Sequence, residues 1–545
     1  MTLAPPAVAP AEAPVAPRRT VWTSLLLPWL LLAILGSLWA LATPIGGSPD
    51  EPAHVVKAAS VVRGELLPET MVERGGVLHV PAAIAFENQV PSCFAFYADI
   101  PASCSPAFEG DPGALVETFS SASLYNPVYY ALVGWPSLIL PDFTGIYAMR
   151  IMSAVLTSFF LATCFWMIGS WGARRLPTLG VMIGITPIVT YLMGTVNPNA
   201  LEFTAGLALF AGMLSIVLHP NEQLLGGRLA LVVISAALVS NSRGISPLWV
   251  AVLLVLPLVL LTGRQLGALL KRPGVWVSIL LIAITALISG WWTLSSNSLG
   301  TAPSAGPDVA PPNSGVGLSP IEGFFGLIGD FYGQLRQMVG ILGWLDTTLH
   351  PVVYYVAYAM FALLVVGVVI FVRGRKLVFV ILLAAAFFFL PPLVQAFYVT
   401  KGGFIWQGRY TLILLMALLL GMAACIAASD RFLRWRRSTV PLLIVAILAA
   451  AGWVYVVAYA FATTMRRMAS GYKTDWPAML EPGAWVPPLG SVALIALFTA
   501  ASVGFGVYVI VGGRDRRPAR PTPEPLPAGA AYPPLRSPEQ KAYPW

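Results

Sequence analysis

The feature that most constrains this chain is its series of apolar runs of about 20 residues, separated by short polar tracts. An α-helix rises 1.5 Å per residue, so about 20 residues cross the roughly 30 Å hydrocarbon core of a bilayer. We therefore predict an all-α polytopic membrane protein. Its predicted membrane-spanning helices, about twelve, lie at residues 22–42, 145–170, 176–195, 199–218, 228–242, 245–262, 275–294, 351–372, 377–398, 409–428, 438–462 and 488–512.

The composition excludes an ordinary soluble protein. Only 10% of the residues are charged and 57% are hydrophobic, whereas soluble domains carry roughly 25% charged residues. The net charge of +8 comes from short basic tracts between apolar runs, so it does not indicate nucleic-acid binding. The first apolar run is long and lacks a small-residue cleavage site, so we interpret it as an anchor and not as a signal peptide.

The basic tracts predict the orientation of the chain. Tracts such as Arg174-Arg175 and Lys271-Arg272 are expected on the cytoplasmic side. With Arg18-Arg19 cytoplasmic, the alternation of the spans places every basic tract inside. This topology predicts a plasma-membrane protein with both termini in the cytoplasm. Its extracytoplasmic loops are residues 43–144, 295–350, 399–408 and 463–487, and we expect the large first loop to contain short helices.

The remaining segments complete the predicted organisation. Residues 1–21 and 513–545 are rich in Ala, Pro and polar residues, and we predict disordered tails on either side of a single transmembrane domain, residues 22–512. A span at 125–140 would break the charge pattern, so we predict an interfacial or re-entrant helix that starts at Pro127 and ends at Pro136 and Pro141. Segment 321–342 is amphipathic, and we favour a helix on the bilayer surface over a gating element.

The four cysteines fall into two groups. Cys93 and Cys104 share one polar loop that the topology places outside the cell, so we predict a disulfide between them. Cys164 and Cys425 lie inside apolar runs, where we expect small core residues.

Polar and ionisable residues gather at the outer ends of the predicted spans. Removing such groups from water costs several kcal/mol, so their concentration favours a polar site at the outer membrane boundary, although each one alone could cap a helix or reach lipid headgroups. The stretch SPDEPAH, after the first span, contributes Asp50, Glu51 and His54. The other candidates are Arg150, Glu202, Arg243, Asp346, Lys401, Trp406, Gln407, Arg409 and Tyr410.

Motifs of soluble enzymes are missing from the sequence. It has no P-loop, no GxGxxG after a strand, and no HExxH, CxxC or GxSxG. With four His and four Cys, a zinc site is not expected. Carboxylate oxygens suit hard cations, so Mg²⁺ or Mn²⁺ at Asp50 and Glu51 remains open.

A series of short motifs resembles a known family. SPDEPAH, YNPVYY, VNPNALE, SRGISPLW, GILGWLDTTL and WQGRY follow one another in this order between about residues 25 and 510. In this respect the chain resembles the bacterial membrane proteins of DUF2142, a domain of unknown function that is common in actinobacteria. That family in turn resembles the GT-C glycosyltransferases, which take sugar from a polyprenyl-phosphate donor and carry an acidic residue or pair in the first extracytoplasmic loop.

The resemblance implies a GT-C-like fold in which Asp50 or Glu51 is the catalytic acid of those enzymes. A carboxylate would take the proton of the acceptor hydroxyl, and a second would orient it or hold a cation. Arginine suits phosphate, so Arg243 and Arg409 are the expected donor contacts, with Lys401 behind them. YNPVYY stands where those enzymes carry a PPL-type stretch, but with Asn-Pro in place of Pro-Pro, and the chain lacks the soluble C-terminal domain of many relatives.

We therefore predict a glycosyltransferase that acts on a cell-envelope glycan or lipid acceptor at the outer face. Trp406 and Tyr410 could stack on the sugar or the first prenyl units, or belong to the interfacial aromatic belt. A transporter or flippase of lipid-linked cargo is the second hypothesis, although the sequence shows neither mid-membrane charges nor an internal repeat. A non-catalytic envelope-assembly protein, for which the acidic pair would be dispensable, is the third. Which of the two carboxylates takes the proton stays open.

Overall fold

The computed structural model describes residues 21–72, 75–298, 313–435 and 440–515, and it is predominantly helical. The predicted all-α polytopic membrane architecture is confirmed. In the described residues ten helices are long and apolar enough to cross a bilayer. They are η1–α2 (Trp22–Ala42), α7 (Phe143–Gly169), α10 (Pro198–Leu218), α11 (Glu222–Ser240), α14 (Pro273–Ser295), α17 (Pro351–Phe371), α18 (Arg375–Gly402), η5–α19 (Gly408–Ala427), α21 (Val440–Ser470) and α22 (Ser491–Gly512).

Two of the predicted spans take a different form. Segment 176–195 is a pair of helices, α8 (Arg175–Gly184) and α9 (Pro187–Met193), bent by 70° at the break. Pro187 lacks an N–H, so it cannot continue the hydrogen bonding of α8. Segment 245–262 is α12 (Ser246–Val255) followed by the 3₁₀ turn η4 (Leu256–Leu260). Together they are shorter than the helices that are long enough to cross a bilayer. The predicted number of about twelve is thus corrected to ten in the described residues, or up to eleven with the bent pair.

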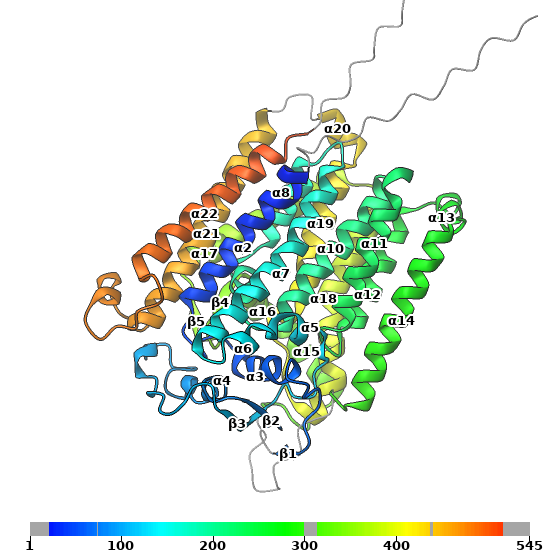
Figure 1. Ribbon diagram of the computed structural model, residues 1–545. Coiled ribbons are helices and arrows are strands. Elements are labelled where there is room, and N and C mark those ends of the chain that lie inside the picture. The colour runs from blue at the N-terminus through cyan, green and yellow to red at the C-terminus, as the bar shows by residue number, and fades with distance from the viewer. Residues whose placement is uncertain (1–20, 73–74, 299–312, 436–439, 516–545) are drawn as a thin grey trace, which may run out of the picture.

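The helices run between two ends of the molecule (Figure 1). One end holds the start of α2, the end of α22, the short helix α13 (Gly263–Leu270) and α20 (Asp430–Trp435). The other end, called here the loop end, holds the large connections. Nearly all of α10 and α19 is buried in the centre of the bundle, whereas α14 stands at its edge with most of its length facing outward.

The first large loop forms a small layer over the loop end (Figure 1). The predicted short helices are present, but its antiparallel sheet was not predicted. The helices are α3 (Glu51–Val61), α4 (Ala82–Phe86), η2 (Val90–Cys93), η3 (Ala102–Cys104), α5 (Pro127–Gly134) and α6 (Pro136–Ile139). The sheet has the order β1 (Met71–Val72), β2 (Gly75–Pro81) and β3 (Leu115–Ser120). In β2 the alternate residues Leu78 and Val80 are buried, which is the period-two pattern of a half-buried strand.

Segment 125–140 does not form a long helix. α5 begins at Pro127, as predicted, but Pro136 begins α6 instead of ending a helix. Neither helix meets the length criterion for a membrane span.

The predicted amphipathic helix at 321–342 is two helices, α15 (Pro320–Gly329) and α16 (Phe331–Gly340), followed by β4 (Ile341–Leu342), which pairs with β5 (Thr347–Thr348). α15 packs closely on α18 at Gly323. A Cβ added to this glycine would lie 2.5 Å from a Val399 methyl carbon, so a larger residue would not fit there. Its other face leaves Ile321 and Phe325 exposed, as a helix at the bilayer surface would.

Two predicted loops begin later than expected. α18 continues to Gly402, and α21 continues to Ser470 before the turn η6 (Trp476–Leu480). The predicted tails, 1–21 and 513–545, lie almost entirely outside the described residues, as does much of the Gly- and Pro-rich start of the 295–350 loop.

Candidate functional site

Asp50 and Glu51 open helix α3 at the loop end. Asp50 has φ 62°, a left-handed conformation that non-glycine residues rarely adopt, and its side chain does not cap the helix. Glu51 is the first helical residue and Pro52 the second, a position where a missing N–H costs nothing. This sharp entry directs the two neighbouring carboxylates to different surroundings.

Glu51 is completely buried and is bound on both oxygens. Arg150 of α7 donates from Nε to Oε1 at 2.8 Å and from Nη2 to Oε2 at 2.6 Å. The backbone N–H of Val196 also donates to Oε1, at 2.9 Å. The same guanidinium donates to the carbonyls of Thr43 and Pro44, at 2.6 and 2.9 Å. The Glu51–Arg150 pair therefore joins the end of α2, the start of α3 and α7, and it leaves no free carboxylate oxygen for chemistry.

Asp50 is the accessible member of the pair. Its side chain is 48% exposed, and Arg409 of η5 (Gly408–Thr411), itself only 3% exposed, donates from Nη2 to its Oδ2. Exclusion of water would raise the pKa of Asp50, but the charge of Arg409 outweighs this and holds the pKa below its ordinary value. Asp50 is therefore ionised at neutral pH and partly open to solvent.

Tyr410 connects the two arginines of the site. The guanidinium carbon of Arg243 lies 4.1 Å from the centre of the Tyr410 ring, and that of Arg409 lies 5.2 Å from it. Both distances fit cation–π contact. Arg243 also lies 3.6 Å from Glu202 Oε2 of α10, an ion pair too long for a strong hydrogen bond.

Glu202 is buried and is held by its own neighbours. Its carboxylate accepts hydrogen bonds from Ser246 Oγ at 2.5 Å and from Asn199 Nδ2 at 3.0 Å. Within the described residues, buried Arg243 Nη1 and Arg409 Nε have no hydrogen-bond partner. The cluster of Asp50, Arg409, Tyr410, Arg243 and Glu202, called here the Asp50 cluster, therefore contains unused donors.

His54 lies one turn after Asp50 on α3 and is neutral. Burial is the largest influence on this imidazole and lowers its pKa to about 3, although the Asp50 charge acts in the opposite direction. Its Nδ1 lies 2.8 Å from the Tyr130 hydroxyl, and its ring lies 5.7 Å from that of Tyr125. His54 therefore packs beneath the Asp50 cluster and is not an acid or base for chemistry near pH 7.

A cavity of about 300 Å³ adjoins the Asp50 cluster. Arg243 and Tyr410 line it, whereas Asp50 and Arg409 do not. Its other lining residues are Ser121, Tyr125, Asn126, Gly244, Ile245, Ser289, Trp292, Thr293, Ser298, Val394, Gln395, Tyr398, Ile405 and Trp406. Five of these sixteen lining residues are aromatic and several others are polar. Aromatic surface combined with convergent polar groups is typical of a small-molecule binding site.

The loop that carries Trp406 and Arg409 is held in place by Gln395 of α18. Gln395 Nε2 donates to the Gly403 carbonyl at 2.8 Å, and its Oε1 accepts from the N–H of Trp406 at 3.0 Å. Trp406 in turn donates to Thr411 Oγ1 at 3.0 Å and contacts the ring of Tyr410. Gln395 thus acts as a positioning residue for one wall of the cavity.

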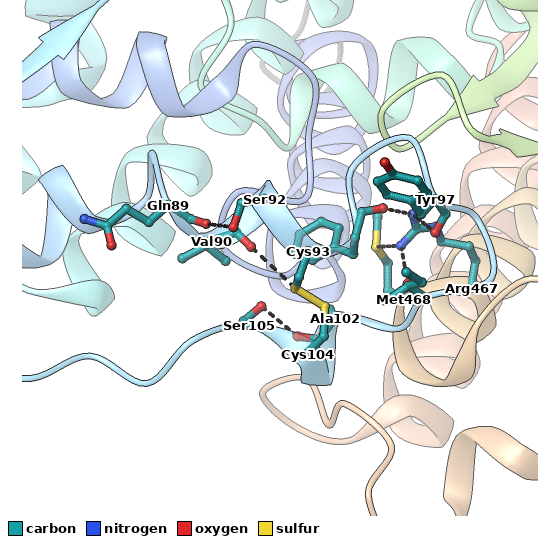
Figure 2. The surroundings of a disulfide bond; sticks show 12 residues. Gln89, Val90, Ser92, Cys93, Tyr97, Ala102, Cys104, Ser105, Arg467 and Met468 are labelled. Atoms are coloured by element: carbon teal, nitrogen blue, oxygen red, sulfur yellow. Dashed lines mark hydrogen bonds between the residues drawn. A yellow bond between two sulfur atoms is a disulfide. The ribbon is translucent and has the colours of Figure 1, made fainter.

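Asp346 belongs to a different cluster, in which it pairs with Arg467. The Cys93–Cys104 disulfide is present as predicted, and Arg467 lies near it (Figure 2). Arg467 of α21 donates from Nη2 to Asp346 Oδ2 at 2.6 Å and to the Phe94 carbonyl at 2.8 Å. Arg467 and Asp346 therefore fasten the disulfide loop to α21, and Asp346 does not face the cavity.

Two other predicted contacts are also outside the cavity. Lys401 is exposed on the last turn of α18 and does not line it. Gln407 is not among the lining residues, and its Oε1 is buried without a hydrogen-bond partner in the described residues.

The family of the chain follows from a match across most of its length. A family described as "Predicted membrane protein (DUF2142)" matches residues 32–418. The chain belongs to this family. The match ends before the expected limit of about residue 510. The matched residues include the Asp50 cluster and the cavity lining, whereas Arg467 lies beyond them. No curated protein and no solved structure matches the chain. The likeness of this DUF2142 protein to GT-C enzymes therefore stays a prediction.

The geometry does not fit a cation held jointly by Asp50 and Glu51. The carboxylates bind different arginines, and both Glu51 oxygens accept hydrogen bonds. Among the described residues, no group of three or more His, Cys, Asp or Glu side chains is arranged to hold a metal ion.

Sequence reasoning missed several lining residues of this DUF2142 protein. Tyr125 and Asn126 begin the motif YNPVYY, which served for the predicted helix at 125–140 and for the resemblance but not for the site. Gln395 is a polar residue inside a long apolar run, after Pro391 and Pro392, and this unusual position was a usable signal. Trp292, on the outward-facing helix α14, carried no signal apart from its aromatic character.

Proposed function

We propose that this protein is a membrane glycosyltransferase that moves a sugar from a polyprenyl-phosphate donor to a cell-envelope acceptor, with Asp50 as general base. The observation that carries this proposal is the position of Asp50. It is a half-exposed carboxylate bound to Arg409, and Tyr410 connects that pair to Arg243 and to an aromatic-lined cavity. A base, cationic groups and a cavity at one membrane boundary are the parts that such a transfer needs.

In the proposed reaction, an acceptor hydroxyl attacks the anomeric carbon of the sugar. The new C–O bond forms while the bond from that carbon to the phosphate oxygen breaks, and the electron pair leaves with the lipid phosphate. The hydroxyl proton passes to Asp50. Because an alcohol has a pKa far above 7, removal of this proton in the transition state lowers the barrier. Asp50 can accept it because the carboxylate is ionised at neutral pH.

Arg243 and Arg409 are the proposed phosphate contacts. A planar guanidinium binds phosphate oxygens through paired, charge-assisted hydrogen bonds. Arg243 lines the cavity, and both side chains have a nitrogen without a hydrogen-bond partner in the described structure. Trp406 and Tyr410 supply flat apolar surfaces beside them, on which a sugar face or the first prenyl units would stack.

We assign structural roles to three residues that the sequence placed in the site. Glu51 and Arg150 neutralise each other in the interior. Asp346 neutralises Arg467 near the disulfide. The proposed chemistry therefore uses one carboxylate, Asp50, and requires no cation shared with Glu51.

We place the site on the outer face of the plasma membrane. The opposite end of the bundle carries most of the basic tracts, which supports a cytoplasmic position for that end under the positive-inside rule. The layer at the loop end is richer in acids, and it contains a disulfide, which persists in oxidising compartments. The described basic residues at the opposite end include Arg174, Arg175, Arg264, Lys271, Arg272, Arg373, Arg375, Lys376, Arg431, Arg434 and Arg514.

The decisive experiment compares three variants of the full chain: Asp50→Asn, Glu51→Gln and Glu109→Gln. Glu109 is an exposed acid of the same loop and serves as the matched control. Membranes with equal amounts of folded protein are incubated with tritium-labelled polyprenyl-phosphate hexoses and pentoses, and the labelled product is measured. Loss of a general base typically costs ~10²- to 10⁴-fold in rate. We expect this loss for Asp50→Asn, and for Glu51→Gln a loss of folded protein instead.

Two outcomes would contradict this proposal. Asp50→Asn with transfer equal to that of Glu109→Gln would remove Asp50 as the base. Movement of labelled lipid across the bilayer without a glycosidic product would favour the transporter hypothesis. If neither transfer nor movement occurs but envelope glycans fail to form without the protein, a non-catalytic assembly role would replace both.

A further inference from the structure

An apolar groove lies along the same two helices as one side of the cavity. Helices α12 and α18 both pass from one hollow to the other: Ile245, just before α12, and Val394 of α18 line the cavity, whereas Ala251 and Leu393 line the groove. The groove has a volume of about 460 Å³. On α18 it extends from Leu393 to Ala385, which at 1.5 Å per residue is about 12 Å along the helix.

The wall of the groove is entirely apolar. It consists of Ala251, Val252, Val255, Leu256, Ala385, Ala386, Phe389, Leu390 and Leu393. Val255, Phe389 and Leu393 have exposed side chains, so the groove is open sideways to the bilayer. Toward the opposite end of the bundle, η4 packs on α18, and its first residue, Leu256, lines the groove. Such a surface offers no hydrogen bond, so only a hydrocarbon chain fits it.

The two helices leave this space for identifiable reasons. Alanine side chains at Ala251, Ala385 and Ala386 do not fill it. Pro391 and Pro392 lie within the stretch of α18 that lines the groove, just before the cavity residue Val394. Proline removes a backbone hydrogen bond and limits regular helix packing. The polar and apolar hollows thus follow one another along α18, with cationic Arg243 above and hydrocarbon-like walls below.

We infer that the groove between α12 and α18 holds the isoprenoid chain of a polyprenyl phosphate whose phosphate lies in the cavity beside Arg243. The choice of ligand rests on the proposed function, whereas the location rests on the two adjoining hollows. Arg243 matches the anionic headgroup, and the groove matches its chain. One groove between one pair of helices accommodates one chain, which favours a single-chain lipid over a two-chain glycerophospholipid.

Binding of undecaprenyl phosphate to the purified full chain tests this inference without any transfer step. The variants Ala251→Trp and Ala385→Trp place an indole in the groove, and Ala283→Trp on the outward-facing side of α14 is the matched control. Native mass spectrometry gives Kd for undecaprenyl phosphate, for geranyl phosphate and for dioleoyl phosphatidic acid. Thermal unfolding shows whether each variant is folded, and Ala385→Leu replaces any tryptophan variant that is not.

We expect both groove variants to raise Kd for undecaprenyl phosphate about tenfold or more, because the indole occupies the space of the chain next to the phosphate. The Kd for geranyl phosphate, whose chain is short, should rise less in the groove variants. The Ala283→Trp variant should bind undecaprenyl phosphate with the same Kd as the unmodified protein. Unchanged Kd in folded groove variants, or no binding by the unmodified protein, would overturn the inference. If phosphatidic acid binds the unmodified protein as tightly as undecaprenyl phosphate does, and its Kd rises equally in the groove variants, the occupant is a general phospholipid and the inference fails.

The same variants separate this inference from the proposed function. If the groove variants transfer sugar with unchanged KM, the groove assignment fails while the glycosyltransferase proposal stands. If chain-dependent binding is found but no donor supports transfer, the groove assignment stands and the enzymatic proposal fails.

Discussion

Asp50 and Glu51 are adjacent in the sequence, but their carboxylates bind different arginines and differ in access to solvent. Glu51 is fully buried with Arg150 of α7, whereas Asp50 is 48% exposed and binds Arg409 of η5. The left-handed backbone of Asp50 turns the chain between them. One side chain of the pair is therefore committed to holding helices together, and the other remains available for chemistry.

The Glu51–Arg150 ion pair should stabilise the fold, and the effects of removing its two members should not be additive. Glu51→Gln and Arg150→Met each leave the other charge buried without its partner, which typically costs about 3–5 kcal/mol. We expect each single variant to lower Tm strongly. The double variant should lower it by less than the sum of the two, because it leaves no unpaired charge. Thermal unfolding in one detergent checks this, and simple additivity would contradict the pairing.

Arg243 and Arg409 should control binding of the donor phosphate. Arg243→Lys and Arg409→Lys keep the positive charge but lose the planar pair of donors. The loss of one charge-assisted hydrogen bond corresponds to about a 10- to 100-fold rise in the donor Kd. Lys401→Gln is the control, since Lys401 is exposed and lies outside both the Asp50 cluster and the cavity lining. A rise in Kd for Lys401→Gln with no change for either arginine variant would show that only general positive charge is involved.

Glu87 should make stability fall as the pH rises. It is buried, accepts from the Gly46 N–H at 3.1 Å, and burial together with the nearby Glu51 charge raises its pKa to about 8. The folded state therefore holds a proton that the unfolded state releases near pH 4.5. The contribution of Glu87 is complete below pH 4.5 and is lost as the pH rises toward 8.

The variant Glu87→Gln keeps the acceptor oxygen but cannot ionise. The difference in Tm between the variant and the unmodified protein should grow in favour of the variant between pH 5 and pH 8. Thermal unfolding at several pH values measures it, and the subtraction removes every group that titrates equally in both proteins. A constant difference would mean that Glu87 does not titrate in this range.

The disulfide and Arg467 should stabilise the same loop independently of chemistry at Asp50. A disulfide between residues 11 positions apart contributes about 2–4 kcal/mol in small loops. Cys93→Ser with Cys104→Ser, or Arg467→Gln, should increase proteolysis of residues 88–110 and leave the Kd for lipid phosphate within about twofold. Thiol labelling of unreduced protein should modify neither cysteine. A large loss of lipid binding would instead connect this loop to the cavity.

Much of the architecture could be predicted because it depends on local composition. Runs of about 20 apolar residues identified most spans, and the polar loop containing Cys93 and Cys104 identified the disulfide. The bend before Pro187 and the short helix α12 were missed, because an apolar run has the same composition whether it is straight, broken or short. The sheet β1–β3 was missed because its strands are only partly buried and flanked by glycine.

For the candidate site, the sequence by itself supplied the chemical groups, and the tertiary structure decided their roles. The motif SPDEPAH identified two acids just after the first span, and the ends of other spans supplied arginines. Which acid stays accessible depends on partners 99 and 359 positions away, Arg150 for Glu51 and Arg409 for Asp50. Those partners are selected by how α2, α3, α7 and η5 pack, and packing between distant helices is not encoded in any local pattern.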